Sequence, residues 1–119
     1  MPKIKASELT APALDWAVAK CEGIDLFETE GWLYAEEGRK PYRPSTDWAL
    51  AGPIIEREEI GIRRHLPCLR GREWEASPSI SAKGAGGKIC YGPTPLIAAM
   101  RCYVASRMTD EVEVPEVLL

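Results

Sequence analysis

TPLIAAMRCYVASR, residues 94–107, is the segment around which the rest of the chain is arranged. Thr94 can accept a hydrogen bond from the unpaired N–H groups of a first helical turn, and Pro95 follows where a missing N–H costs little. Apolar side chains then recur at helical spacing, at Leu96, Ala99, Met100, Tyr103 and Val104. The segment therefore predicts an amphipathic helix whose apolar face must be covered by the other elements.

A second amphipathic helix is expected at residues 11–21, where Leu14, Ala17, Val18 and Cys21 fall on one face. Gly23 can close it, because glycine accepts the left-handed conformation in which helices often end. A third helix is expected after residue 44, with Ser45 or Thr46 as its cap. Gly52 and Pro53 should interrupt it, since proline removes a helical hydrogen bond.

Strands are predicted where β-branched and aromatic residues cluster between turn signals. Residues 24–29 and 31–35 indicate a hairpin about Glu30 and Gly31, and residues 60–66, 72–76 and 89–91 indicate further strands, the first of them ended by Pro67. The chain should therefore be an α+β protein of one domain, residues 1–119. We expect an antiparallel sheet of about four strands packed with two to three helices, α-β-α sandwich-like, with the C-terminal helix in the core, a flexible loop at about 83–88 and a tail at about 110–119.

Composition argues against several classes of function. The 18 carboxylates outnumber the 15 lysines and arginines, which argues against nucleic-acid binding unless cations cluster in space. One such cluster occurs, and it is either a nucleic-acid contact or a solvated strand edge with a cationic turn: Arg63, Arg64, His65, Arg70 and Arg72. The four cysteines form no C-x-x-C pair and there is one histidine, so neither a metal site nor a cofactor is indicated. No signal peptide precedes the first helix and no apolar run is long enough to cross a bilayer, so we expect a cytoplasmic protein that is not in the membrane.

No catalytic constellation stands out. KGAGGK, residues 83–88, has the glycines of a phosphate-binding loop but is followed by Ile89 instead of serine or threonine at a helix start. A small-ligand site for a nucleotide-like anion remains as one hypothesis, with four candidate cations: Arg63, Arg64, Lys83 and Lys88. An enzyme using Cys68 or Cys90 with His65 is the least favoured reading.

A protein interface is the other hypothesis. Tryptophans often anchor interfaces, so the candidate contacts with an unknown host or phage protein are Trp16, Asp47 and Trp48. Small residues on the back of the C-terminal helix, Ala98, Cys102 and Ala105, would let another helix approach closely. That helix is either the one expected at residues 11–21 or one of a second copy, and the second case allows a homo-oligomer.

Three stretches together resemble the NinX-like family of small proteins encoded by lambdoid and related tailed phages and prophages. They are ALDWAVAK (residues 13–20), PSTDWA with GPIIERE (residues 44–49 and 52–58) and YGPTPLIAAMRCYVAS (residues 91–106). The order of elements also resembles, more loosely, a phage α-β-α sandwich domain. Neither resemblance brings catalytic residues.

What the resemblance implies is a phage or prophage accessory protein in the cytoplasm of a bacterial host. With no catalytic motif in the chain, the hypothesis is a non-enzymatic binding or regulatory protein that acts on a host or phage macromolecule. The alternative is a protein that binds or sequesters a small nucleotide-like ligand.

Overall fold

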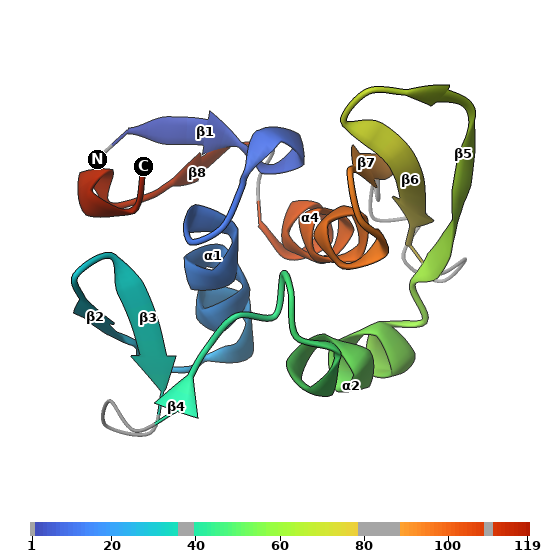
Figure 1. Cartoon of the computed structure of the whole chain (residues 1–119). Helices are drawn as coiled ribbons and strands as arrows, with labels where there is room; N and C mark the ends of the chain where they lie inside the picture. The colour runs from blue at the N-terminus through green and yellow to red at the C-terminus, as the bar shows by residue number, and fades with distance from the viewer. Residues whose placement is uncertain (1, 36–39, 79–88, 109–110) are drawn as a thin grey trace.

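The computed structural model describes residues 2–35, 40–78, 89–108 and 111–119. Its α-helices are α1 (Ala13–Glu22), α2 (Trp48–Glu58) and α4 (Pro95–Arg107), and two short 3-10 helices, η1 (Ala6–Glu8) and η2 (Glu116–Leu118), lie near the chain ends. Helices and strands alternate along the chain and pack together. The predicted α+β class is confirmed (Figure 1).

The described strands form three small antiparallel sheets instead of one sheet of about four strands. The first pairs β1 (Lys3–Lys5) with β8 (Glu111–Glu113); the second contains β2 (Phe27–Thr29), β3 (Trp32–Ala35) and β4 (Lys40–Pro41); the third contains β5 (Gly61–Leu69), β6 (Arg72–Ser77) and β7 (Cys90–Gly92). The sheets stay separate because helices lie between them (Figure 1). Two or three short strands are marginal alone, so the helices must cover them.

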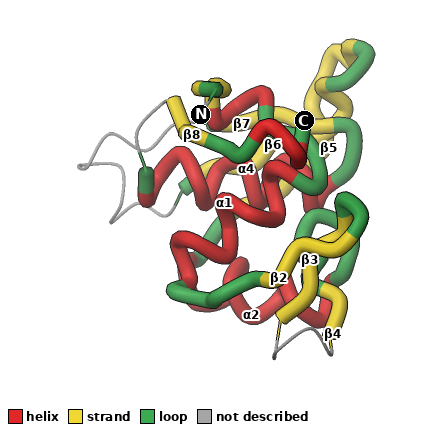
Figure 2. The backbone as a smooth tube through the Cα atoms, turned by 90° about the vertical axis from the view of Figure 1, so that its left-hand side faces the viewer, coloured by secondary structure: helices red, strands yellow, loops and turns green. Residues whose placement is uncertain are grey.

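Helix α4 occupies the centre, as predicted. Thr94 caps it by accepting the Ile97 N–H at 3.2 Å, and Pro95 is its first residue. It contacts β5, β6 and β7 on one side and α1, α2 and η1 on others (Figures 1 and 2). Its buried face contains all five predicted core residues, Leu96, Ala99, Met100, Tyr103 and Val104.

The other two helices differ in detail from expectation. Helix α1 ends at Gly23, whose φ of 70° confirms the predicted left-handed cap. Helix α2 is continuous through Pro53, and Asp47 caps it in place of Ser45 or Thr46. The uninterrupted helix has a local reason, since Gly52 has no Cβ to crowd the proline ring that follows it.

Among the predicted strands, the first hairpin is confirmed and the predicted end of the strand at residues 60–66 is wrong. The first hairpin turns at Glu30 and Gly31, as predicted, and both residues have a positive φ. Strand β5 does not end at Pro67 but continues to Leu69, and its pairing with β6 shifts register between Arg64 and Leu69. Such an irregularity accommodates a residue that has no N–H to donate.

The chain ends are tied to each other. Strand β1 pairs with β8, and the Val114 N–H donates to the Pro2 carbonyl at 3.0 Å. The predicted tail is therefore anchored in its described part, where Val112, Val114 and Leu118 are buried. The loop predicted at residues 83–88 lies outside the described residues.

Candidate functional site

The three predicted partner contacts occupy different environments. Trp48, the first residue of α2, leaves 55% of its surface exposed. Asp47 is used locally, because its carboxylate accepts the Ala49 N–H at 2.9 Å. Trp16 packs partly against the core, and the Lys20 ammonium lies 5.2 Å from its ring centroid. Among these three predicted contacts, Trp48 alone therefore offers a large apolar surface to a partner.

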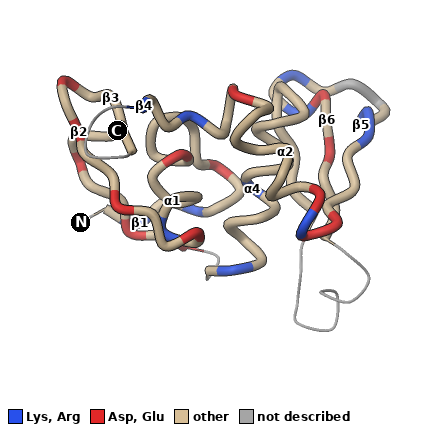
Figure 3. The backbone as a smooth tube through the Cα atoms, turned by 90° about the horizontal axis from the view of Figure 1, so that it is seen from below, with Lys and Arg blue, Asp and Glu red and all other residues tan. Residues whose placement is uncertain are grey.

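The predicted anion contacts divide between described and undescribed parts of the chain. Arg63 donates to the Glu75 carboxylate at 2.5 Å, whereas Arg64 lies over the Trp74 ring at 5.5 Å. Neighbouring residues of a strand point to opposite faces, so these two cations do not converge. Figure 3 shows cationic positions on β5 beside acidic positions on β6. Lys83 and Lys88 lie outside the described residues.

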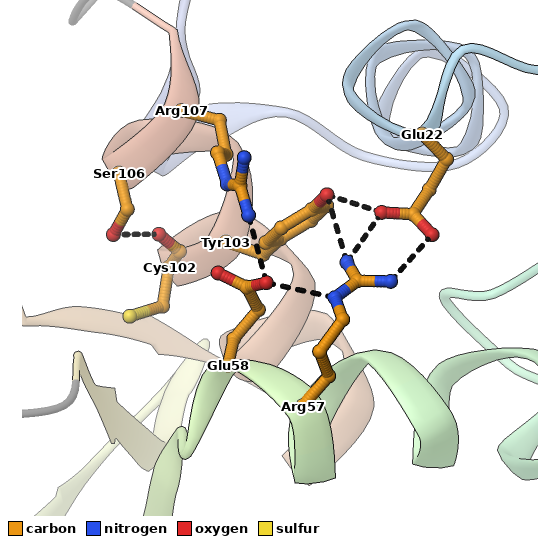
Figure 4. Close-up of polar contacts among 7 residues, drawn as sticks. All are labelled: Glu22, Arg57, Glu58, Cys102, Tyr103, Ser106 and Arg107. Carbon is orange, nitrogen blue, oxygen red and sulfur yellow. Dashed lines mark hydrogen bonds and ion pairs between the residues drawn. The ribbon is translucent and has the colours of Figure 1, made fainter.

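A polar cluster joins α1, α2 and α4 on their shared side (Figure 4). Arg57 of α2 donates two hydrogen bonds to the Glu22 carboxylate of α1, at 3.1 and 2.6 Å, and Tyr103 of α4 donates its hydroxyl to the same carboxylate. Glu58 accepts from both Arg57 and Arg107 at 2.8 Å. The hydrogen bonds from Arg57 lower the pKa of Glu22. The charges are compensated within the cluster, which indicates a structural role.

We expect Glu22→Gln to lower the free energy of unfolding by about 1–2 kcal/mol at pH 7, because a charge-assisted two-bond contact is lost. The pKa of Glu22 is lowered in the native state, so its contribution is present above the ordinary glutamate pKa and disappears as the pH falls. The difference between variant and wild type should therefore shrink in urea unfolding at pH 3. Glu28→Gln, in the exposed strand β2, is the control; an equal loss there would contradict the assignment.

A buried arginine lies on the opposite side of α4. Arg101 is 9% exposed, and it donates from Nε to the Leu9 carbonyl at 2.8 Å and from Nη1 to the Tyr91 carbonyl at 2.7 Å. Both acceptors are neutral. Burial lowers the pKa of Arg101, since desolvation disfavours the cation.

Arg101 lines a cavity of about 400 Å³ together with Arg70 and Arg72; we call this cavity the arginine pocket. Arg70 and Gly71 form the turn between β5 and β6, where Gly71 has a φ of 81°. Arg72 pairs with Leu69 across the turn and lies over the Tyr91 ring at 5.1 Å. The hairpin turn and α4 thus contribute three arginines to the lining of one cavity.

A second cavity lies beside the arginine pocket, since Ser7, Arg72 and Tyr91 line both. It measures about 450 Å³, and Ile89 and Ala105 give part of its lining an apolar character. Lys5 and Glu111 also line the second cavity, so its wall is mixed in character. An anionic group in the arginine pocket would have this mixed space beside it for an organic group.

A buried carboxylate lies elsewhere, between α1 and the segment before α2. Asp15 is 1% exposed; its Oδ1 accepts the Ser45 N–H at 2.8 Å, and its Oδ2 has no hydrogen-bond partner among the described residues. Burial raises the pKa of Asp15 to about 6, although the bonds from Ser45 and the charge of Arg43 act in the opposite direction. Asp15 also lines a cavity of about 400 Å³ beside Trp32, whose ring lies under Arg43 at 4.9 Å.

Sequence reasoning did not anticipate either buried charge. The available signal for Arg101 was a lone cation inside the apolar run from Leu96 to Val104. Asp15 gave a similar signal next to Leu14, since a charged residue near an apolar stripe is seldom fully buried without a reason. The small residues Ala98 and Cys102 also prove fully buried within the chain, so they do not form an outer face for a second copy.

In the described part of the chain, no three histidine, cysteine, aspartate or glutamate side chains are grouped as they would be around a metal ion. None of its helices has the length and apolarity needed to cross a membrane. The family model for bacteriophage P22 NinX matches residues 5–107. No curated protein matches the chain.

Proposed function

The chain belongs to the bacteriophage P22 NinX family and is a phage accessory protein, and we propose that it acts without catalysis, by binding a host or phage macromolecule in the bacterial cytoplasm. The observation that carries this proposal is the exposure of Trp48 at the start of α2. A large aromatic side chain left in water is a typical interface anchor. The ion pairs of the cluster in Figure 4 are internally satisfied, so they offer no competing centre for chemistry.

The host and phage proteins recovered by the tagged protein from infected-cell lysate test the proposal. We expect Trp48→Ala to reduce capture of a specific partner at least tenfold, because truncation of an interface tryptophan costs about 2 kcal/mol or more. The fold should be unaffected, since Trp48 lies outside the core.

Trp32→Ala is the matched control, because Trp32 is 52% exposed but belongs to β3. Equal loss in both variants would indicate nonspecific aromatic adhesion. Capture of the same proteins by wild type and Trp48→Ala would overturn the assignment of Trp48.

A second candidate function is the binding or sequestration of a small nucleotide-like ligand. The arginine pocket favours it, because three cations line one cavity of about 400 Å³, a size usual for small-molecule sites. A panel of nucleotides screened by thermal unfolding tests it. If no nucleotide raises the unfolding temperature, this function is excluded.

A further inference from the structure

The charge of Arg101 has no anionic partner in the native chain. Its two hydrogen bonds go to the carbonyls of Leu9 and Tyr91, and no carboxylate of the described residues forms an ion pair with it. Nη2 makes no hydrogen bond with those residues. A buried charge without a counter-charge is costly, so an anion that reached this guanidinium would be bound favourably.

The surroundings reinforce that attraction. Arg70 and Arg72 line the same pocket, and Glu8 is the one carboxylate among the described residues of its lining. Glu8 is exposed, and its charge acts to raise the pKa of Arg101, but no ion pair joins the two side chains in the described part of the chain. Three cations against one carboxylate leave an excess of positive charge in a protein whose net charge is -3. The pocket is therefore a local exception to the acidic balance of the chain.

The geometry suits a phosphate group with an organic body. Guanidinium groups recognise phosphate oxygens through planar pairs of N–H donors, and two of the three guanidiniums are already positioned, Arg101 by carbonyls and Arg72 by the Tyr91 ring. A cavity of about 400 Å³ exceeds the size of a bare phosphate ion. The adjoining cavity, with Ile89 and Ala105 in its lining, provides room for an uncharged ring system.

We propose that the arginine pocket binds the phosphate of a small phosphomonoester, with nucleoside 5′-monophosphates as the ligand class. The proposal rests on the second candidate function and names its site. Arg101 supplies a charge already removed from water, and Arg70 and Arg72 close on the ligand from the hairpin turn. The terminal phosphate, with its two negative charges, is the group recognised.

Isothermal titration calorimetry with AMP, inorganic phosphate and adenosine, all at one ionic strength, tests the proposal. We expect AMP to bind, phosphate to bind more weakly and adenosine not to bind. Arg72→Ala and Arg70→Ala should each weaken AMP binding five- to tenfold. Lys40→Ala removes one exposed charge on β4, outside the pocket lining, and should change it less than twofold.

Two further variants distinguish a loss of ligand binding from a loss of folding. Glu8→Gln removes the carboxylate of the pocket and should tighten AMP binding two- to threefold, a gain that unfolding cannot produce. Arg101→Lys keeps the charge but loses the planar fork, so it should weaken binding at least tenfold at a temperature where it remains folded. In ¹⁵N-labelled protein, AMP should shift the Arg101 Nε–H resonance.

The possible outcomes distinguish failure of the arginine pocket as the binding site from failure of nucleotide binding itself. If AMP binds but Arg72→Ala binds equally well, nucleotide binding stands and the arginine pocket is overturned. If phosphate and AMP bind equally at the pocket, the preference for an organic body is overturned. If a single-stranded oligonucleotide without terminal phosphate binds tighter than AMP, the site recognises nucleic-acid backbone and the phosphomonoester proposal fails. If no phosphate compound binds, site and second function fall together, while the pull-down with Trp48→Ala still tests the first.

Discussion

At pH 8 the Asp15→Asn variant is expected to unfold with a free energy about 3 kcal/mol larger than wild type. Burial raises the pKa of Asp15 from 3.8 to about 6 in the native state. Because the native state keeps this proton to a higher pH than the unfolded chain, stability falls as the pH rises from about 4 to about 6 and then stays low. Asparagine has no charge to desolvate, and its Oδ1 can still accept the Ser45 N–H.

Urea unfolding at pH 4, 6 and 8 measures this effect. The gain should fall below about 1 kcal/mol at pH 4, where the native carboxyl is protonated. Asp47→Asn makes the same chemical change at an exposed helix cap, and asparagine caps as well as aspartate, so its effect should stay within about 1 kcal/mol. Lower stability of Asp15→Asn at pH 8 would mean that Arg43 and Ser45 stabilise the carboxylate more than burial destabilises it.

Gly92→Ala is expected to lower the free energy of unfolding by about 2–3 kcal/mol. A Cβ at Gly92 would stand 2.8 Å from the Ala98 nitrogen and 3.0 Å from Cγ2 of Ile97. The first contact is with helix backbone, which cannot move aside without displacing α4 from β7. The end of β7 can approach the first turn of α4 this closely only because glycine has no side chain.

Gly61→Ala is the matched control, at the start of β5. Its Cβ would meet Oγ of Ser77 at 3.2 Å, and a serine side chain can rotate away. Urea unfolding should show a loss below about 1 kcal/mol for Gly61→Ala. The change in the unfolded chain favours folding in both variants, so an equal loss in both would mean that contact with the α4 backbone is not the source of the cost at Gly92.

Local sequence signals predicted the elements whose ends are set by their own residues. Thr94 and Pro95 specify the start of α4 wherever that helix lies, and Glu30 with Gly31 specifies a hairpin turn. The prediction of an interruption at Gly52 and Pro53 was wrong because it counted the hydrogen bond that proline removes and not the relief that a preceding glycine gives to the proline ring. The division of the strands into three sheets could not be predicted, since it depends on where the helices pack.

The arginine pocket depends on contacts between residues distant in sequence. Arg101 meets the Leu9 carbonyl across 92 positions, and Asp15 meets the Ser45 N–H across 30. Spacing along one helix shows that Arg101 interrupts an apolar run, but not that a hairpin turn brings Arg70 and Arg72 beside it. The predicted cations Arg63 and Arg64 are close in sequence to Arg70 and Arg72. They are neighbours on strand β5, so their side chains point to opposite faces of the sheet.

The pairing of β1 with β8 has a consequence for how the chain is made in the cell. Lys3 can pair with Glu113 only after all the residues between them have left the ribosome, and the Leu9 carbonyl cannot accept its hydrogen bond before Arg101 has emerged. Helix α4 is synthesised after the elements that pack on it, namely η1, α1, α2, β5, β6 and β7. A nascent chain without residues 95–113 therefore lacks the surface on which its earlier elements pack, and its core can close only after those residues have emerged.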